Sequence, residues 1–274
     1  MDADVNEIDI PERTTSTGIQ SIENGTPVLR ALVRAKGAMS LTAIAAATGM
    51  APGKAHKYLA SYIRAGLVVQ HESGGRYDLG PFALELGAAA MRRISIMEIA
   101  QPAMDDLRNL LGHTISLALW ANHGPTIMRI AEAPEIMSLT VRFGTVMPLL
   151  TSSFGRVFAA YLDRRLTQGL IQAELADPKG IATQAGLKSF ADVEAMLAQF
   201  RMHRMSSAEN LSAPGRAAMA APIFDHNGRM VAAIAMIGVQ GRLDLDFDGR
   251  PARELANTAR KLSQRLGASP DQIV

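Results

Sequence analysis

The chain of 274 residues contains no cysteine. Disulfides and thiolate metal sites are therefore excluded, which suits a protein of the reducing cytoplasm. No segment reaches the roughly 18 uncharged apolar residues that a membrane-spanning helix needs. The N-terminus is acidic and lacks the basic start and apolar core of a signal peptide. We therefore expect a cytoplasmic protein without a membrane partner.

Recognisable catalytic motifs are also lacking. The sequence has no G-x-S-x-G nucleophile turn, no phosphate-binding loop and no G-x-G-x-x-G fingerprint. Its six histidines are scattered without metal-ligand spacing. We expect no enzymatic activity, no cofactor and no metal. A hydrolase that uses Ser152 or Ser153 as its nucleophile stays as a remote alternative.

Charge is distributed unevenly, although the formal net charge is only +2. Residues 1–17 hold five acids and one arginine, a net of −4, and we interpret them as a disordered acidic arm. Residues 18–93 hold nine Lys/Arg and four Asp/Glu, a net of +5. A basic module beside a nearly neutral remainder indicates a polyanionic partner for the first part only. The plainer alternative is that these charges keep a small domain in solution.

Residues 18–80 have the pattern of three helices followed by a hairpin. Thr26 followed by Pro27 predicts the start of the first helix, because proline at the first helical position loses no hydrogen bond. Ser40 is placed to cap a second helix, and Gly49 suits the positive φ angle of the turn after it. This order predicts a winged helix-turn-helix domain.

The third helix is expected to begin at Pro52 and to turn a polar, basic face away from its buried stripe. A helix in a DNA major groove needs short polar or cationic groups towards its N-terminal end. An ordinary solvated helix face has similar groups, but the turn before this helix and the hairpin after it, with its own turn at 72–75, favour DNA. The predicted DNA-binding residues are Lys54, His56, Lys57, Tyr58, Ser61 and, at the base of the wing, Arg76.

Three segments carry a family resemblance: GIQSIENGTPVLRALV, LTAIAAATGMAPGKAHKYLASYIRAGLV and GGRYDLGPFALELG. They resemble the DNA-binding domain of IclR-type bacterial transcriptional regulators, and the resemblance covers roughly residues 18–266. It implies a partner in double-stranded DNA, with a homodimer or a dimer of dimers on a palindromic operator. Gly53 and Lys54 replace the small hydroxyl residues usual in the family, so no base preference is implied.

Residues 81–95 are expected to form a linker helix, because Phe82 and Leu86 recur on one apolar stripe. A connector with this much apolar surface is not a flexible tether. In the resembling family this helix joins the two domains and takes part in dimer contacts. Packing against its own chain is the alternative.

Residues 96–268 alternate between strand pairs and helices, which predicts an α+β domain around an antiparallel sheet. This order resembles the GAF-like effector domain of the same family. The expected strands are 115–120, 126–131, 139–143, 215–224 and 229–239. Arg129 and Arg142 in these strands are candidates to pair with an anion, although such residues more often face solvent or an acid.

The segment GTVMPLLTSSFGRVFAAYL, residues 144–162, is the strongest candidate for a ligand site. Hydroxyl groups and backbone N–H groups at the start of a helix suit a carboxylate, whereas simple N-capping would need only one hydroxyl. The segment matches the family's PLH-hydroxyl-A-x-G-K motif, which lines the effector pocket, except that Leu150 and Arg156 replace the usual histidine and lysine.

The resemblance places further pocket residues by position near the second hairpin. The predicted effector-binding residues are Thr151, Ser152, Ser153, Asn210 or Ser212, Met219, Pro222, Ala235 and Ile237. Most of the later ones are apolar, which implies a small-molecule carboxylate with an apolar or aromatic body. The sequence thus predicts an effector-responsive DNA-binding transcriptional regulator. The alternative is a metabolite-binding module whose basic domain contacts protein or RNA.

Overall fold

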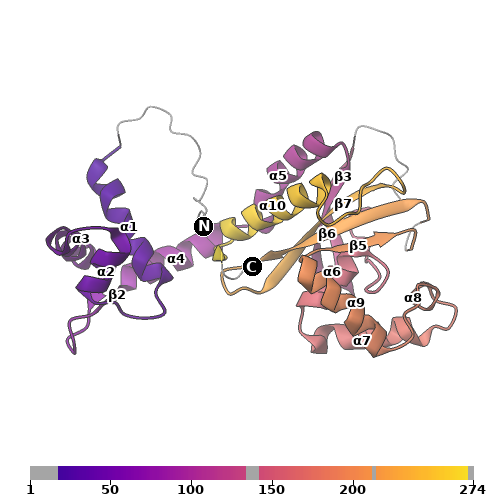
Figure 1. Cartoon of the computed structure of the whole chain (residues 1–274), viewed down its shortest axis with the longest axis horizontal. Coiled ribbons are helices and arrows are strands. Elements are labelled where there is room, and N and C mark those ends of the chain that lie inside the picture. The colour runs from indigo at the N-terminus through magenta and orange to yellow at the C-terminus, as the bar shows by residue number, and fades with distance from the viewer. Residues whose placement is uncertain (1–17, 134–141, 212–213, 271–274) are drawn as a thin grey trace. The chain divides into compact units, whose positions relative to one another are not determined.

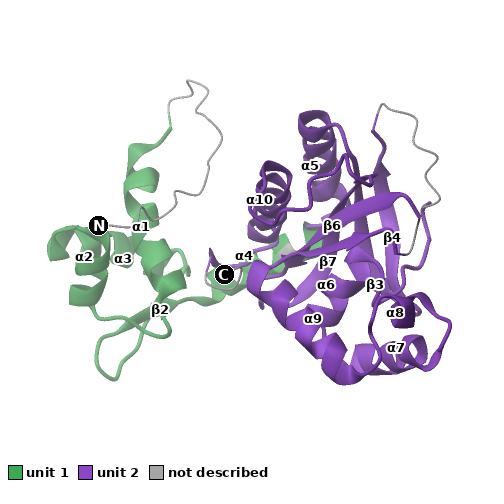
Figure 2. Ribbon diagram, turned by 45° about the vertical axis from the view of Figure 1, so that its right-hand side comes forward, with its two compact units in different colours: residues 1–93 green, residues 94–274 purple. Residues whose placement is uncertain are grey.

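The computed structural model describes residues 18–133, 142–211 and 214–270 (Figure 1). The chain divides into two compact units, residues 1–93 and 94–274, which are described separately (Figure 2). The predicted arm 1–17 lies outside the described residues, as does Ser212. Most of the predicted strand 139–143 lies outside them too.

The first unit is built from helices and one short hairpin. Its elements are α1 (Gln20–Arg34), α2 (Leu41–Thr48), α3 (Pro52–Arg64), β1 (Val68–Gln70), β2 (Tyr77–Leu79) and α4 (Pro81–Arg93). Val28 of α1, Ile44 of α2 and Leu59 of α3 meet in one core, to which the hairpin contributes Tyr77. The predicted winged helix-turn-helix is confirmed. Its small shared core fixes which side of α3 faces outward.

Helix α1 begins at Gln20, so the predicted start at Pro27 is wrong. Thr26 is not a cap, because its hydroxyl donates back to the carbonyl of Ile22 at 2.8 Å. Of the residues in these extra turns, Gly25 is the buried one, and it packs against α3. A Cβ atom on Gly25 would lie 2.2 Å from the hydroxyl oxygen of Tyr62, so the two helices meet more closely than a side chain would permit. Tertiary contact here overrides the local capping signal.

The turn between α2 and α3 is as predicted. Ser40 caps α2 by accepting a hydrogen bond from the N–H of Ala43 at 3.2 Å. Gly49 ends α2 with a φ angle of +64°, and Pro52 is the first residue of α3. These local signals need no distant partner, which is why the sequence was sufficient to place them.

The second unit contains the larger core. Its elements are α5 (Ile96–Leu111), β3 (Thr114–Ala121), β4 (Gly124–Ala131), α6 (Ser153–Tyr161), α7 (Arg164–Ala176), α8 (Ile181–Gln184), α9 (Phe190–His203), β5 (Ser206–Glu209), β6 (Arg216–Phe224), β7 (Met230–Val239) and α10 (Arg250–Arg265). In the described residues one antiparallel sheet has the order β4-β3-β7-β6-β5. The α+β class is confirmed. Helices α7 and α8 and the four-residue strand β5 were not predicted.

Each face of this sheet packs on different helices (Figure 2). Successive strand residues point to opposite faces. Ile115 and Leu117 of β3 join the core cluster with α5 and α10, whereas Ala118 joins the cluster with α6. We call these the α5/α10 face and the α6 face. No helix in the described part of the chain has an apolar stretch long enough to cross a bilayer.

Candidate DNA-binding surface and effector site

Helix α3 turns a basic residue directly away from the core of the first unit. Ala55 and Leu59 are fully buried. Lys57 is two residues from each of them, which on a helix of 3.6 residues per turn places it about 200° away, on the outer side. Lys54 and His56 are exposed as well. The exposed part of α3 therefore presents cationic and polar groups near its N-terminal end.

Two of the predicted DNA-binding residues also have partners inside the fold. Tyr58 is half-buried and stacks on Tyr62 with ring centroids 6.4 Å apart. Ser61 donates to the carbonyl of Lys57 at 3.1 Å and accepts from Arg64 at 3.3 Å. Arg64 was not among the predicted residues. It is seven residues after Lys57, a spacing that returns to the same helix face.

The wing is attached to the loop before α2. Tyr77 and Met39 exchange two backbone hydrogen bonds, of 2.8 and 2.9 Å. Arg76 is exposed, and one of its guanidinium nitrogens lies 3.5 Å from the carbonyl of Ala38. The base of the wing is therefore held against the helices, which fixes where Arg76 emerges.

In the second unit, the start of α6 buries the predicted hydroxyl residues. Thr151, Ser152 and Ser153 are 2%, 2% and 3% exposed. Ser152 is the N-cap: its hydroxyl accepts from the N–H of Gly155 at 2.9 Å and donates to the carbonyl of Pro148 at 2.6 Å. The side chain of Ser152 therefore caps its own helix, as the simple N-capping alternative predicts.

Two charged side chains hold the turn that precedes α6. The Glu174 carboxylate accepts from the N–H of Leu149 at 2.5 Å and of Leu150 at 2.9 Å. The guanidinium of Arg156 donates to the carbonyls of Leu150 at 2.8 Å and Ser207 at 2.5 Å. Burial lowers the pKa of Arg156 to about 10. Burial also raises the pKa of Glu174, against the opposing effect of its two backbone hydrogen bonds. The arginine that replaces the family's lysine therefore ties the turn to β5.

Backbone donors remain free beyond the residues that Glu174 binds. In the part of the chain that the structure describes, the N–H groups of residues 151–154 have no hydrogen-bond partner. Such N–H groups at a helix N-terminus carry partial positive charge and favour an anion. The internal carboxylate occupies the N–H groups of 149 and 150, so an external one has only this later set.

The register of the sheet separates the predicted pocket residues. Ala235 faces α6, and Ile237, two residues on, lies on the same face. Met219 packs on the α5/α10 face, the opposite side of the sheet from the start of α6. Its neighbour Ala220 faces α6. A shift of one residue along a strand exchanges the two faces, and position in a family pattern is not accurate to one residue.

Two further residues lie elsewhere. Asn210 has a φ angle of +53°, and its side chain accepts from the N–H of Gly215 at 2.9 Å, which closes the loop between β5 and β6. Pro222 lines a separate cavity beside α10. Asn210 therefore serves the loop after β5, and Pro222 lines a cavity that has no lining residue from the 148–154 turn.

Ser116 of β3 is a site candidate that sequence reasoning missed. It is fully buried and pairs in register with Ala235, on the face that packs against α6. Its hydroxyl has no hydrogen-bond partner among the described residues. A buried hydroxyl without a partner is destabilising, so the presence of Ser116 at this position needs a functional explanation. The only signal in the sequence is a serine at an inward position of an otherwise apolar strand.

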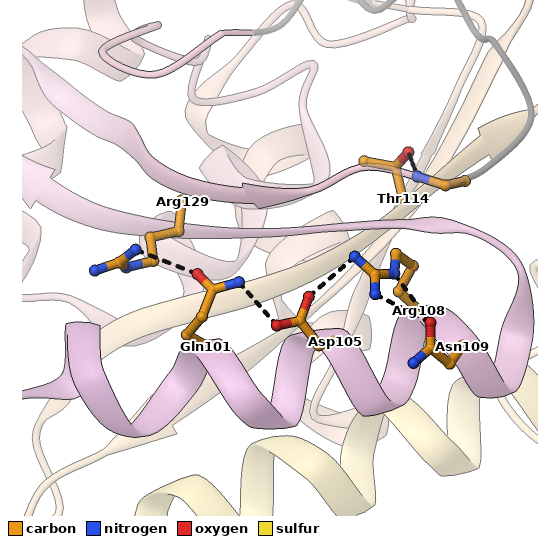
Figure 3. Close-up of polar contacts among 7 residues, drawn as sticks. Gln101, Asp105, Arg108, Asn109, Thr114 and Arg129 are labelled. Carbon is orange, nitrogen blue, oxygen red and sulfur yellow. Dashed lines mark hydrogen bonds and ion pairs between the residues drawn. The ribbon is translucent and has the colours of Figure 1, made fainter.

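The interior arginine Arg129 belongs to the other face of the sheet (Figure 3). Its guanidinium donates to Gln101 of α5 at 3.3 Å, and Gln101 donates to Asp105 at 3.1 Å. Asp105 in turn pairs with Arg108 at 3.0 Å. Arg142 is exposed and lies outside any strand. No group of three potential metal ligands occurs among the described residues.

Comparison with known proteins agrees with this arrangement. The family model of the IclR helix-turn-helix domain matches residues 21–72, and that of the bacterial transcriptional regulator IclR C-terminal domain matches residues 88–264. The chain belongs to the IclR family of bacterial transcriptional regulators. As an IclR-family protein it has an N-terminal DNA-binding domain and a C-terminal effector domain.

Individual relatives extend over nearly the whole chain. The Glycerol operon regulatory protein of Streptomyces coelicolor is 28% identical, over 91% of this chain and 97% of that protein. The transcriptional repressor IclR of Escherichia coli is 25% identical, over 83% of each. The crystal structure of Pseudomonas aeruginosa HmgR is 33% identical, covers 92% of this chain and 100% of that chain, and has a TM-score of 0.82. The first two relatives are a regulatory protein and a transcriptional repressor, and the family is one of transcriptional regulators, which removes the hydrolase alternative.

Proposed function

We propose that this IclR-family regulator binds a small carboxylate between the start of α6 and the α6 face of its sheet. The observation that carries the proposal is the set of free N–H groups at residues 151–154, which favours an anion. The unpartnered hydroxyl of Ser116 on the same face of the sheet supports it, because a ligand oxygen would satisfy this group.

The surrounding side chains favour an apolar or aromatic ligand body. Ala118, Ala220 and Ala235 line this face of the sheet with small apolar groups. Trp120 packs on Phe158 of α6 with ring centroids 5.8 Å apart, which adds aromatic surface to the same core cluster. An aromatic carboxylate combines both features: an anionic group for the backbone donors and a flat apolar body for the core.

A binding experiment tests the ligand class. Trp120 is the only tryptophan, so its fluorescence reports on this core cluster without labelling. The structure of an IclR homolog from Microbacterium hydrocarbonoxydans, 16% identical, was determined in complex with 4-hydroxybenzoate, which makes that compound a suitable first probe. We expect saturable binding of 4-hydroxybenzoate or a related aromatic acid, by calorimetry and by fluorescence. We expect no binding of the corresponding benzyl alcohols, in which a CH2OH group replaces the carboxylate. Flat traces across a panel of aromatic acids would contradict the proposal.

We further propose that two copies of the first unit bind a palindromic operator, with α3 in the major groove. The outward position of Lys57 and the attached wing support this orientation. A gel-shift experiment with the DNA beside the protein's own gene separates operator binding from contact with protein or RNA. Lys57→Ala should weaken binding, whereas Lys179→Ala, an exposed lysine of the second unit, should not. Equal binding by both variants would argue against this use of α3.

A further inference from the structure

A cavity lies in the DNA-binding unit, where α1 meets α2. Its volume is about 470 Å³, within the range of ligand pockets. It is lined by residues of the second half of α1, by Ala35 and Met39 after that helix, and by Ala47 of α2. No residue of α3 or of the wing hairpin lines it. The DNA contacts proposed above therefore make no use of this cavity.

The cavity combines an apolar part with two unpaired positive charges. Arg30 and Arg34 are exposed on α1, and neither has a hydrogen-bond or ion-pair partner in the part of the chain that the structure describes. They are four residues apart, which places them on one side of the helix about 6 Å apart along its axis. The other lining residues form the apolar part: Pro27, Ala31, Ala35, Met39 and Ala47. Because no acid is among them, an occupant would have to match a charge of +2.

The acidic arm, residues 1–17, has the matching charge within the same chain. Its net charge is −4, whereas residues 18–93 carry +5, so the two together come to +1. The arm directly precedes α1, and in residues 7–10 two acids alternate with two isoleucines. Charge and composition therefore favour this segment as the occupant.

The spacing within residues 7–10 matches the spacing of the arginines. In an extended segment, successive side chains point to opposite sides, and those on one side recur about every 6.6 Å. The two carboxylates would then lie along Arg30 and Arg34, and the two isoleucines would point to the apolar part of the cavity. Residues 2–5 alternate in the same way, but their alanine and valine would bury less apolar surface.

The chain is long enough for this contact. Residues 11–19 connect the segment to the start of α1, and nine residues span up to about 30 Å when extended. From Gln20 to Arg34 the helix rises about 21 Å. The arm can therefore turn back along α1, which places the later carboxylate at Arg30 and the earlier one at Arg34. A short connection also gives the segment an effective concentration on the order of millimolar, so weak contacts are enough to populate the bound arm.

We propose that residues 7–10 of the acidic arm bind in this cavity of the same chain. Their two carboxylates pair with the guanidinium groups of Arg30 and Arg34 through charge-assisted hydrogen bonds, and their two isoleucines pack on the apolar part. DNA phosphates would match the charges but would leave the apolar part unused, so the arm is the better occupant. The contact compensates part of the basic charge of the DNA-binding unit, and with it part of the attraction for DNA of any sequence.

Disulfide trapping in the full-length protein tests this contact, because the chain has no cysteine of its own. Asn6→Cys places a thiol beside the segment, and Ala47→Cys places one at an exposed position that lines the cavity. In the control pair, Asn6→Cys is combined with Ala65→Cys, which is exposed just after α3 and does not line the cavity. We expect the intramolecular disulfide of the first pair to form at least about tenfold faster under diamide, and to form more slowly at high salt. Equal rates for the two pairs would overturn the proposal, as would a disulfide between two chains, which would place the arm on a second copy.

Charge variants of the arm locate the contact. Glu7→Gln/Asp9→Asn should lower the rate of the first pair to that of the control pair. Asp2→Asn/Asp4→Asn removes the same two charges from elsewhere in the arm and should leave the rate unchanged. Each change is made in both pairs, so that its effect on thiol reactivity cancels in the ratio of rates. Equal slowing by the two changes would mean non-specific attraction and would contradict the proposal.

The alternative occupant of the arginines is the phosphate backbone of DNA. In that case Arg30→Gln/Arg34→Gln would weaken operator binding in a gel shift, while the two disulfide pairs formed at equal rates. That combination would overturn the proposal. We expect instead that the double arginine variant lowers the ratio of trapping rates, and that Lys36→Gln, an exposed charge outside the cavity lining, leaves it unchanged.

Discussion

At the scale of single residues, Ser152 and Glu174 fix the turn before α6 by different means. Ser152 bonds forward to Gly155 and back to Pro148, so it stabilises the helix end directly. Glu174 reaches in from α7 and binds two backbone N–H groups with a buried carboxylate. Local sequence is enough to recognise the first role. The second role depends on Glu174, which is more than twenty positions from the turn, and no residue near the turn indicates this contact.

Removing the N-cap hydroxyl of Ser152 should lower the stability of the protein. Ser152→Ala leaves the N–H of Gly155 without its partner, and the expected loss is about 1 kcal/mol of unfolding free energy. Chemical denaturation with urea measures it. Ser153→Ala is the matched control, because the backbone carbonyl of Ser153, not its hydroxyl, accepts from Ser206. A loss in the Ser153 variant equal to that in Ser152 would contradict the assignment of the cap.

The Glu174 carboxylate should make stability depend on pH. Because burial raises its pKa in the folded state above the ordinary value of 4.5, the folded protein holds this proton more tightly than the unfolded chain. Its contribution is therefore complete below about pH 4.5 and declines as pH rises through the folded-state pKa. Glu174→Gln cannot ionise, so the stability of the natural protein relative to this variant should fall over that range. The exposed Glu85→Gln is the control, and a difference that rises with pH would contradict the assignment.

At the scale of elements, the packing of helices and strands against one another determines where α1 begins and which face of the sheet each strand residue occupies. Helix α1 extends past its apparent proline start because Gly25 lets α3 pack against it. The strands β6 and β7 were predicted from alternation and a turn, but alternation does not state which face meets which helix. For that reason the sequence could not show that Met219 packs on the α5/α10 face. Ser116 was missed for a related reason: an unpartnered hydroxyl is visible only when all neighbours are known.

Helix α6 should tolerate no side chain at Gly155. A Cβ atom there would lie 2.1 Å from the carbonyl oxygen of Pro148 and 2.5 Å from the Cα of Leu149, and neither backbone atom can yield easily. Gly155→Ala should therefore cost about 2 kcal/mol or more of unfolding free energy. Gly169→Ala is the matched control inside α7, where the added Cβ meets no atom within 4 Å. It should stabilise by about 0.5–1 kcal/mol, since alanine is the better helix former.

The contrast between these two glycines also serves the ligand proposal. If Gly155→Ala displaces α6 from the 148–149 turn, the free N–H groups at residues 151–154 move with it. Binding of 4-hydroxybenzoate or a related acid should then weaken together with stability, whereas Gly169→Ala should leave binding unchanged. An unaltered affinity in a destabilised Gly155→Ala protein would place the ligand elsewhere.

At the scale of the whole molecule, the two units divide the function between them. The first has the outward basic face of α3 and the attached wing, and the second has a core that buries polar groups without partners. Sequence patterns were sufficient for the class of each unit, because helix caps, alternation and turn residues act locally. They were not sufficient for the proposed ligand site, whose residues belong to β3, to the turn before α6 and to α7.

A ligand can regulate DNA binding only if its affinity differs between the DNA-bound and free proteins. The coupling must then be reciprocal: the factor by which the effector changes operator affinity equals the factor by which operator DNA changes effector affinity. We expect this factor to be about 5 to 150, the range of a coupling free energy of 1–3 kcal/mol. Fluorescence titration of the effector with and without a saturating operator duplex measures one side, and a gel shift with and without effector measures the other. A factor of one would mean that the acid binds without regulating, and unequal factors would mean that the two titrations report different sites.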